Sequence, residues 1–131
     1  LVYNPLLKQH ELAYSYGFYL RRFVKNIQDK GATAIVCSPI PRNAWVNDTV
    51  RRSNYADWAM EAAQMSEAFF IPLQDMVIEA YQKEGKDAVN TKYFDSKDAT
   101  HTLKEGAELN AKLLAQYLKN TPKIGLKKVM L

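Results

Sequence analysis

The chain has 131 residues, 47% of them hydrophobic and 24% charged, and this balance excludes a chain that is disordered over most of its length. Its formal net charge of +4 comes from lysine and arginine residues scattered along the sequence, which argues against a nucleic-acid-binding face. No apolar run approaches the roughly 20 residues of a membrane helix, and no signal peptide is visible.

The first regular element that the sequence predicts is a helix that begins near Tyr16. Residues 1–12 show no regular pattern, so we expect an irregular opening segment. Apolar residues then recur at helical spacing as far as Ile27, with polar residues off that face. Gly31 is a natural helix stop, so we expect the helix to end just before it.

A buried strand and a second helix are predicted next. The run 32–37 is short, apolar and β-branched, which is typical of a strand buried on both faces of a parallel sheet. Two prolines end it, because proline cannot continue a central strand. We expect a loop over residues 45–52 and a helix over 55–65, capped by Ser53 or Asn54.

The second half of the chain repeats this order of strand and helix. Residues 69–73 predict a second short buried strand. Asp75 is the expected N-cap of a third helix, and Gly85 is its expected end. A polar loop should then cover residues 90–101.

A fourth helix is predicted to open at Thr102. Thr102 and Glu105 have the spacing of a capping box, in which two side chains satisfy backbone donors of the first turn. Pro122 should stop this helix, and the tail 123–131 is expected to be either an edge strand or a frayed end. The expected buried stripe consists of Ala107, Ala111, Leu114 and Leu118.

Strands that alternate with helices predict an α/β layered fold with a parallel sheet. The length suffices for one domain with a hydrophobic core. Two strands make a poor sheet, however, and strands that are apolar on both faces need parallel neighbours. We therefore expect residues 1–131 to be a single partial domain, whose missing strands come from residues before Leu1 or from another chain.

The sharpest local pattern is an aspartate three residues before a histidine, Asp98 and His101, in the polar stretch ahead of the last helix. An aspartate at this distance can reach back to Nδ1 of the ring, which leaves the other nitrogen free to take a proton from a nucleophile. A surface loop with an incidental Asp and His would show the same short pattern.

Several separated blocks, in the right order, resemble the SGNH (GDSL-type) hydrolase superfamily, and within it the rhamnogalacturonan acetylesterase family. The block that contains Asp98 and His101 is similar to the last conserved block of that superfamily. The similarity runs from about Tyr16 to about Leu118. It rests on residues 16–17, 19–24, 30–33, 38–43, Trp45, Tyr55, Trp58, 70–73, 98–102 and 106–111.

The resemblance implies a three-layer α/β/α, flavodoxin-like fold, of which this chain is the C-terminal half. It implies hydrolysis of acetyl esters on a pectin-like polysaccharide by a Ser-His-Asp mechanism. His101 would be the general base and Asp98 the carboxylate that orients it, with Asp95 a weaker candidate for that carboxylate. Neither Ser15 nor Ser38 stands at the family's nucleophile position.

The same resemblance implies where the rest of the machinery lies. The family's nucleophilic serine and oxyanion donors belong to earlier blocks, so we expect them outside this chain and expect these residues alone to have no measurable acetylesterase activity. Expected partners are an acetylated polysaccharide or oligosaccharide, and the missing N-terminal half of the domain or a second copy. A secreted or periplasmic location follows from such a substrate.

Residues after the first strand are candidates for substrate contact, because ligands bind at the carboxyl edge of open α/β sheets. Trp45 could stack on a sugar ring, and Arg42 could meet a uronate carboxylate, with Asn43 beside them. Packing of the loop by these side chains is an equally good interpretation. Arg51 and Arg52 are a similar but weaker case.

No cofactor or metal site is expected, because two histidines and one cysteine, widely spaced, make no metal-ligand pattern. Two alternatives to an esterase stay open. The chain could be a non-catalytic interaction module on the same scaffold, with its sheet edge covered by a partner. It could also form an exchanged dimer in which two copies complete each other's sheet.

Overall fold

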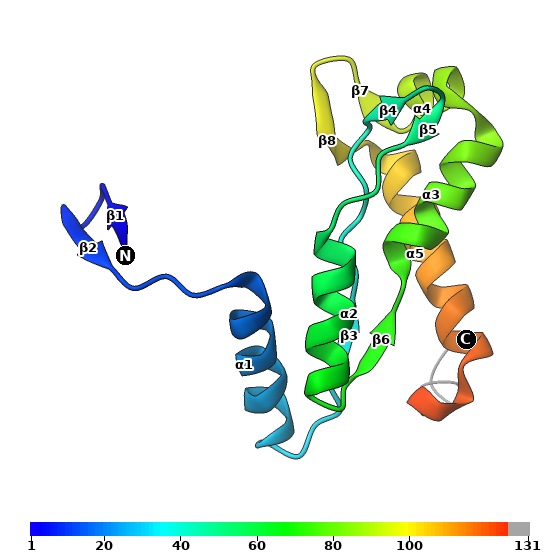
Figure 1. Ribbon diagram of the computed structural model, residues 1–131. Coiled ribbons are helices and arrows are strands. Elements are labelled where there is room, and N and C mark those ends of the chain that lie inside the picture. The colour runs from blue at the N-terminus through cyan, green and yellow to red at the C-terminus, as the bar shows by residue number, and fades with distance from the viewer. Residues whose placement is uncertain (126–131) are drawn as a thin grey trace.

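The structure is a computed structural model, and it describes residues 1–125 (Figure 1). Within these residues, no helix is long and apolar enough to cross a membrane. In chain order the elements are β1 (Val2–Asn4), β2 (Gln9–Glu11), α1 (Tyr16–Gln28), β3 (Ile35–Cys37), β4 (Trp45–Val46), β5 (Thr49–Val50), α2 (Tyr55–Met65), β6 (Phe69–Ile71), α3 (Leu73–Glu84), α4 (Lys86–Lys92), β7 (Phe94–Asp95), β8 (Asp98–Thr102), α5 (Lys104–Asn120) and the 3-10 helix Pro122–Ile124.

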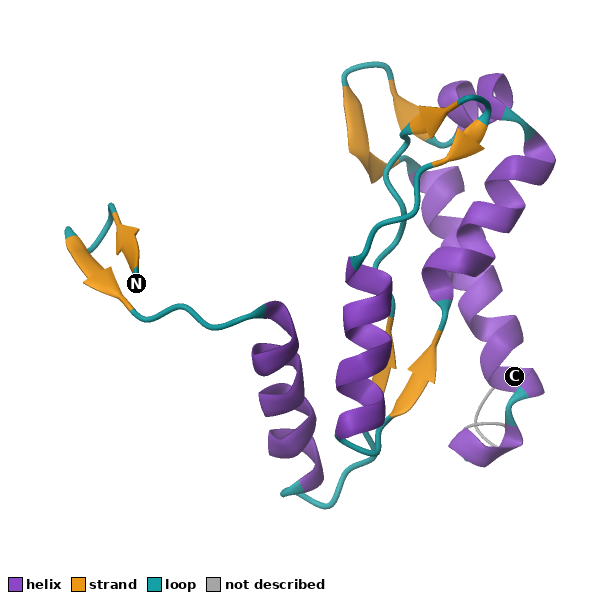
Figure 2. Cartoon of the chain, viewed as in Figure 1, coloured by secondary structure: helices purple, strands orange, loops and turns teal. Residues whose placement is uncertain are grey.

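The centre of the fold is the parallel pair β3 and β6, as the two apolar runs predict (Figure 2). Successive side chains of a strand point to opposite faces. Val36 and Phe70, which are paired across the strands, belong to a core with α1 and α2. Ile35 and Phe69 pack on a second core, built largely from α3 and α5. Helices therefore cover both faces, which confirms an α/β fold with helix, sheet and helix layers.

Small residues let α2 lie close to the sheet. Ala59, Ala62 and Ala63 are completely buried, and Ala56 is nearly so, all along one side of α2. Residues at this spacing share a face of a helix. Alanine adds little bulk there, so the helix backbone can approach the short strands closely.

The sequence predicted an irregular opening segment, and this prediction is wrong. The segment forms an antiparallel hairpin of β1 and β2. Asn4 Oδ1 closes its turn by accepting hydrogen bonds from the backbone N–H groups of Leu6 and Leu7. The hairpin stands away from the layers, joined to α1 by an extended segment (Figure 1). Its apolar side chains are exposed, and its sequence lacks the alternation of apolar and polar residues that predicts a half-buried strand.

A second hairpin, β4 and β5, replaces the loop expected over residues 45–52. Asn47 and Asp48 form its two-residue turn, and both have positive φ, 47° and 60°. Asparagine and aspartate tolerate this backbone region and favour such turns. The Asn-Asp pair between β-branched residues was therefore an available signal for the hairpin.

Helix starts differ from the predicted caps in three places. Ser15 Oγ caps α1 by accepting from Phe18 N–H, a cap that the sequence analysis missed. Asp75 lies inside the first turn of α3 and is not its N-cap. Thr102 does not open α5, because it is paired with Phe94 in β8, so the capping box is absent and the helix begins at Lys104.

The expected polar loop 90–101 is wrong as well, since α4, β7 and β8 occupy this stretch. The buried face of α5 includes Gly106 and Asn110, whereas Ala107 and Ala111, expected in the stripe, are exposed. Leu114 and Leu118 do pack against the core of α3 and α5, as expected, so only the first half of the stripe is offset by one residue. The tail begins with the 3-10 helix, and its residues 126–131 lie outside the described part of the chain.

Candidate active site

The β7–β8 hairpin carries the predicted aspartate and histidine. Its register pairs Asp95 with Asp98, and Asp95 Oδ1 accepts a hydrogen bond from the backbone N–H of Lys97, 2.9 Å away. Asp95 therefore shapes the turn, and its carboxylate has no bond to the histidine. At the base of the hairpin, Leu103 N–H donates to the carbonyl oxygen of Tyr93 at 2.8 Å, which closes the two strands.

Asp98 and His101 form a hydrogen-bonded dyad. Asp98 Oδ2 lies 2.8 Å from His101 Nδ1. Asp98 Oδ1 accepts two backbone hydrogen bonds, from Thr100 at 2.8 Å and from His101 at 2.9 Å. The two residues are thus joined through both the side chain and the backbone, at the separation of three residues that the sequence predicted.

The carboxyl group of Asp98 stays ionised across the ordinary pH range. The backbone N–H groups of His101 and Thr100, followed by the His101 ring, lower its pKa to about 2. Hydrogen bonds to the charged form of a carboxyl group have this effect. An ionised carboxylate can only accept, so the hydrogen of this contact belongs to His101 Nδ1.

The other ring nitrogen of His101 is then unprotonated in the neutral ring. Within residues 1–125 it has no hydrogen-bond partner, and 83% of the side chain is exposed. An imidazole with this tautomer and an open Nε2 can accept a proton from a group brought beside it. The arrangement is therefore chemically competent as a base, although it lies in open solvent.

Asn43 clamps the dyad hairpin onto the rest of the fold. Its backbone N–H donates to the carbonyl oxygen of Ala99, between the two dyad residues, at 2.8 Å. Its side-chain amide donates to Asn90 Oδ1 on α4 and accepts from Trp45 Nε1, each at 2.8 Å. We call Asn43, Asn90 and Trp45 the clamp. It ties the loop after β3 to α4 and to the hairpin.

Of the three predicted substrate contacts, two are hydrogen-bonded within the protein and one is exposed. The polar atoms of Asn43 and Trp45 are engaged inside the clamp, and Trp45 also packs against the larger core. This favours the structural interpretation of these two side chains. Arg42 is exposed and, within the described residues, has no ion-pair partner, so it remains available to a ligand.

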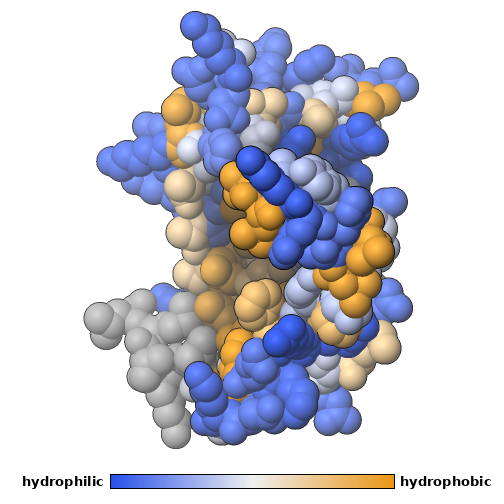
Figure 3. Space-filling view, turned by 90° about the vertical axis from the view of Figure 1, so that its left-hand side faces the viewer, coloured by the Kyte–Doolittle hydropathy of each residue, from blue (hydrophilic) through white to orange (hydrophobic). Residues whose placement is uncertain are grey.

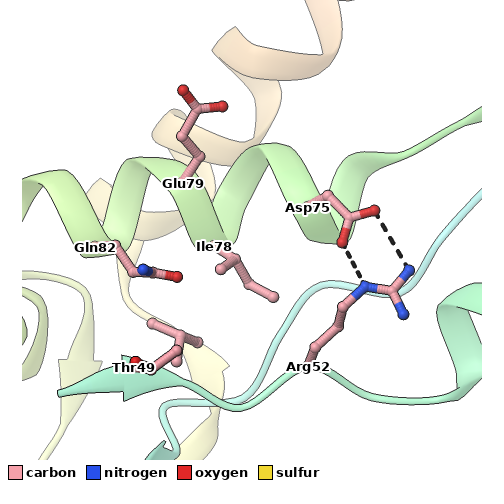
Figure 4. A pocket seen from close by; sticks show the side chains of 7 residues that line it. Thr49, Arg52, Asp75, Ile78, Glu79 and Gln82 are labelled. Atoms are coloured by element: carbon pink, nitrogen blue, oxygen red, sulfur yellow. Dashed lines mark hydrogen bonds and ion pairs between the residues drawn. The ribbon is translucent and has the colours of Figure 1, made fainter. Parts of the chain in front are cut away.

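Arg52 forms ion pairs with two carboxylates. It contacts Asp75 at 2.6 Å and Asp57 at 2.8 Å, and these bonds raise the pKa of the guanidinium. Figure 4 shows Arg52 and Asp75 at one end of a cavity of about 410 Å³ beside α3. The bridge joins the first turns of α2 and α3, so its geometry is that of a structural tie.

A buried network around Ser38 and Gln74 was missed by the sequence analysis. Ser38 is 2% exposed, and its Oγ accepts from Gln74 N–H at 2.8 Å. The Gln74 side chain then bonds the carbonyl of Pro39 and the N–H of Ser53. Burial and these bonds exclude Ser38 as a nucleophile in this conformation, and they fix the carboxyl edge of the parallel pair.

Gly106 is the point where α5 presses against the dyad hairpin. A Cβ at this position would lie 2.8 Å from Thr102 Cβ and 3.1 Å from the carbonyl oxygen of Tyr93. Only a residue without a side chain allows this approach. Within residues 1–125, no group of three or more His, Cys, Asp or Glu side chains is placed to hold a metal ion.

Comparison with known proteins supports the fold. No family model matches the chain, and no curated protein matches it either. The crystal structure of protein YxiM from Bacillus subtilis is similar, with a TM-score of 0.73 and 22% sequence identity. The similarity covers 80% of this chain but 30% of that one, so this chain spans less than a third of that protein's length. At this identity the likeness bears on the α/β fold alone.

Proposed function

We propose that this chain supplies the Asp-His half of a Ser-His-Asp carbohydrate esterase that removes acetyl groups from a pectin-like polysaccharide. One observation carries the proposal: ionised Asp98 holds Nδ1 of His101 and leaves Nε2 open. The resemblance of residues 98–102 and 106–111 to the last block of SGNH hydrolases supports it. The similarity to YxiM is compatible with such a fold and says nothing of the chemistry.

In this mechanism, His101 Nε2 accepts the proton of a serine hydroxyl as its oxygen attacks the acetyl carbonyl. The imidazolium that forms is stabilised by the Asp98 carboxylate. It then gives the proton to the departing sugar oxygen, which leaves an acetyl-enzyme. Water, deprotonated by the same Nε2, attacks that intermediate, and the imidazolium returns the proton to the serine oxygen as acetate leaves.

The proposal assigns the serine and the oxyanion donors to polypeptide outside these 131 residues. That polypeptide is an N-terminal half of the same domain or a second copy of the chain. The exposure of His101 fits this division, because a catalytic base works best where surrounding protein excludes water. The dyad lies beyond the carboxyl ends of β3 and β6, where open sheets bind ligands. Such a substrate would place the protein in a secreted or periplasmic compartment.

A second function is favoured by a different observation, the exposed apolar surface. Leu1, Leu6 and Leu7 on the N-terminal hairpin are 86%, 91% and 60% exposed, and Phe23 on α1 is 63% exposed. Figure 3 shows apolar residues around a hollow in the middle of this face, within a largely hydrophilic rim. A non-catalytic interaction module, or an exchanged dimer, would use this surface to bind its partner.

The two functions are separated by a hydrolysis assay on the intact protein that contains this chain and the serine. Both p-nitrophenyl acetate and acetylated rhamnogalacturonan serve as substrates. We expect His101→Ala and Asp98→Asn each to lower kcat by roughly 10⁴, and the isolated 131-residue chain to show no turnover. Asp95→Asn is the matched control, because an amide oxygen can still accept the Lys97 bond. A loss below tenfold in His101→Ala would contradict the proposal.

A further inference from the structure

A second hollow lies between α1 and α2, away from the dyad. It has a volume of about 490 Å³, within the range of ligand-binding pockets. We call it the α1–α2 pocket. The residues that line it include Tyr16, Gly17, Arg21, Tyr55, Trp58 and Glu61.

Aromatic rings form one wall of the α1–α2 pocket. Tyr16 and Tyr55 are packed edge to face with ring centres 5.0 Å apart, and Tyr55 and Trp58 likewise at 4.9 Å. This packing fixes the ring orientations, yet Tyr55 and Trp58 stay 47% and 45% exposed. Large, rigid, half-exposed rings offer an apolar surface to a flat ligand at low entropic cost.

Two charged side chains complete the pocket from opposite helices, Arg21 from α1 and Glu61 from α2. Within residues 1–125 neither has an ion-pair partner, and Arg21 makes a weak contact with Met65 Sδ at 4.0 Å. A Cβ on Gly17 would lie 3.2 Å from Arg21 Nη1, so the guanidinium rests against the backbone there. Its planar fork is suited to a carboxylate.

We propose that the α1–α2 pocket binds one acidic pyranose ring, a uronic acid. The apolar C–H face of the sugar stacks on Tyr55 and Trp58, its carboxylate meets Arg21, and Glu61 accepts hydrogen bonds from its hydroxyls. The inference rests on the proposed carbohydrate substrate and adds a second place at which that substrate is held.

The pocket and the dyad lie toward one edge of the sheet. Helix α1 leads into β3, and helix α2 connects β3 to β6. Each runs opposite to these parallel strands, so both helices begin near the carboxyl edge of the sheet. Tyr16 and Tyr55 are the first residues of α1 and α2. A polysaccharide that crosses this edge can therefore occupy the pocket while another of its residues reaches His101.

Tryptophan fluorescence tests the proposal, because the chain has two tryptophans and one of them, Trp58, lines the pocket. The protein is titrated with a trimer of galacturonic acid, and with a trimer of galactose as the neutral probe. We expect a saturable signal from the acidic trimer that persists in Trp45→Phe and is lost in Trp58→Phe. The neutral trimer should bind at least tenfold more weakly.

Arg21→Gln should weaken binding of the acidic trimer roughly tenfold or more, as expected for a hydrogen bond to a charged group. Arg22→Gln is the matched control, because Arg22 is the exposed neighbour outside the pocket. No binding by the unaltered protein, equal binding of both trimers, or equal effects of the two arginine variants would overturn the proposal. Occupation of the pocket by a second copy, seen as a dimer that does not bind the trimer, would overturn it too.

His101→Ala should lose ester hydrolysis and bind the trimer as before, because His101 does not line the α1–α2 pocket. In the unaltered intact protein that also contains the serine, trimer binding without ester hydrolysis would uphold the pocket and contradict the esterase. Hydrolysis without trimer binding would uphold the esterase and remove the pocket.

Discussion

Replacing Gly106 with alanine should destabilise the protein and disturb the dyad hairpin. The new Cβ would meet Thr102 Cβ at 2.8 Å, and both Thr102 Cγ2 and the Tyr93 carbonyl oxygen at 3.1 Å. Thr102 belongs to β8, the strand that carries the dyad, and Tyr93 directly precedes β7, so these atoms cannot swing aside as the end of a long side chain would. Overpacking of this kind costs about 1–3 kcal/mol. Three such contacts with atoms held in the hairpin place the cost in the upper part of this range, about 2–3 kcal/mol. Alanine recovers about 1 kcal/mol of helix propensity, so we expect a net loss of about 1–2 kcal/mol.

Gly17→Ala provides the matched control in the first turn of another helix. Its Cβ would contact Arg21 Nη1 alone, at 3.2 Å, and that atom ends a flexible side chain. Helix propensity should then dominate and stabilise the protein by up to about 1 kcal/mol. Urea denaturation measures both free energies of unfolding. The His101 ring resonances should shift in Gly106→Ala and stay unchanged in Gly17→Ala. A Gly106→Ala protein as stable as the unaltered one would refute this reasoning.

Two further predictions concern the clamp and the dyad carboxylate. Asn43→Ala leaves Asn90 Oδ1 and Trp45 Nε1 without the bonds they now make, so it should cost about 1–3 kcal/mol in urea denaturation; Arg42→Ala is the control, and equal stabilities would contradict the clamp. Asp98 has its folded-state pKa lowered to about 2, below the unfolded value of about 3.9. The stability it contributes is therefore complete above the unfolded pKa and is lost as the pH falls from about 4 toward 2. Asp98→Asn should flatten the fall in stability over that window, and an identical pH profile would count against the predicted ionisation.

The central elements could be predicted because their patterns are long or unusual. The two apolar runs, which became β3 and β6, have the composition of strands in a parallel sheet, and Val36 and Ile71 are buried there. The periodicity of α1 and α2 predicts both helices with nearly the observed bounds. In contrast, β7 and β8 are short and mostly exposed, so their residues have the composition of a loop.

Competition between local signals explains the misplaced helix start. Thr102 and Glu105 match a capping box, but strand pairing with Phe94 holds Thr102 in extended backbone. Tertiary pairing of this kind overrides a local propensity. The offset in the first half of the buried stripe follows from Gly106, whose closeness to the hairpin turns that face of α5 inward.

The contact within the dyad could be predicted from the sequence, whereas the clamp that holds its hairpin could not. Asp98 and His101 are three residues apart, so their contact follows from local spacing. The bond of Asn43 to Asn90 joins residues 47 positions apart, which no pattern in a single sequence indicates. Trp45 was a candidate for sugar stacking because the sequence could not show that its indole N–H is already bonded.

The tautomer of His101 tests the central claim most directly, because every later step depends on which ring nitrogen is free. Nitrogen-15 NMR of the neutral ring distinguishes the two forms. We predict that Nδ1 carries the hydrogen, held by Asp98 at 2.8 Å, and that Nε2 is unprotonated. A neutral ring with its hydrogen on Nε2, unchanged by Asp98→Asn, would contradict the account.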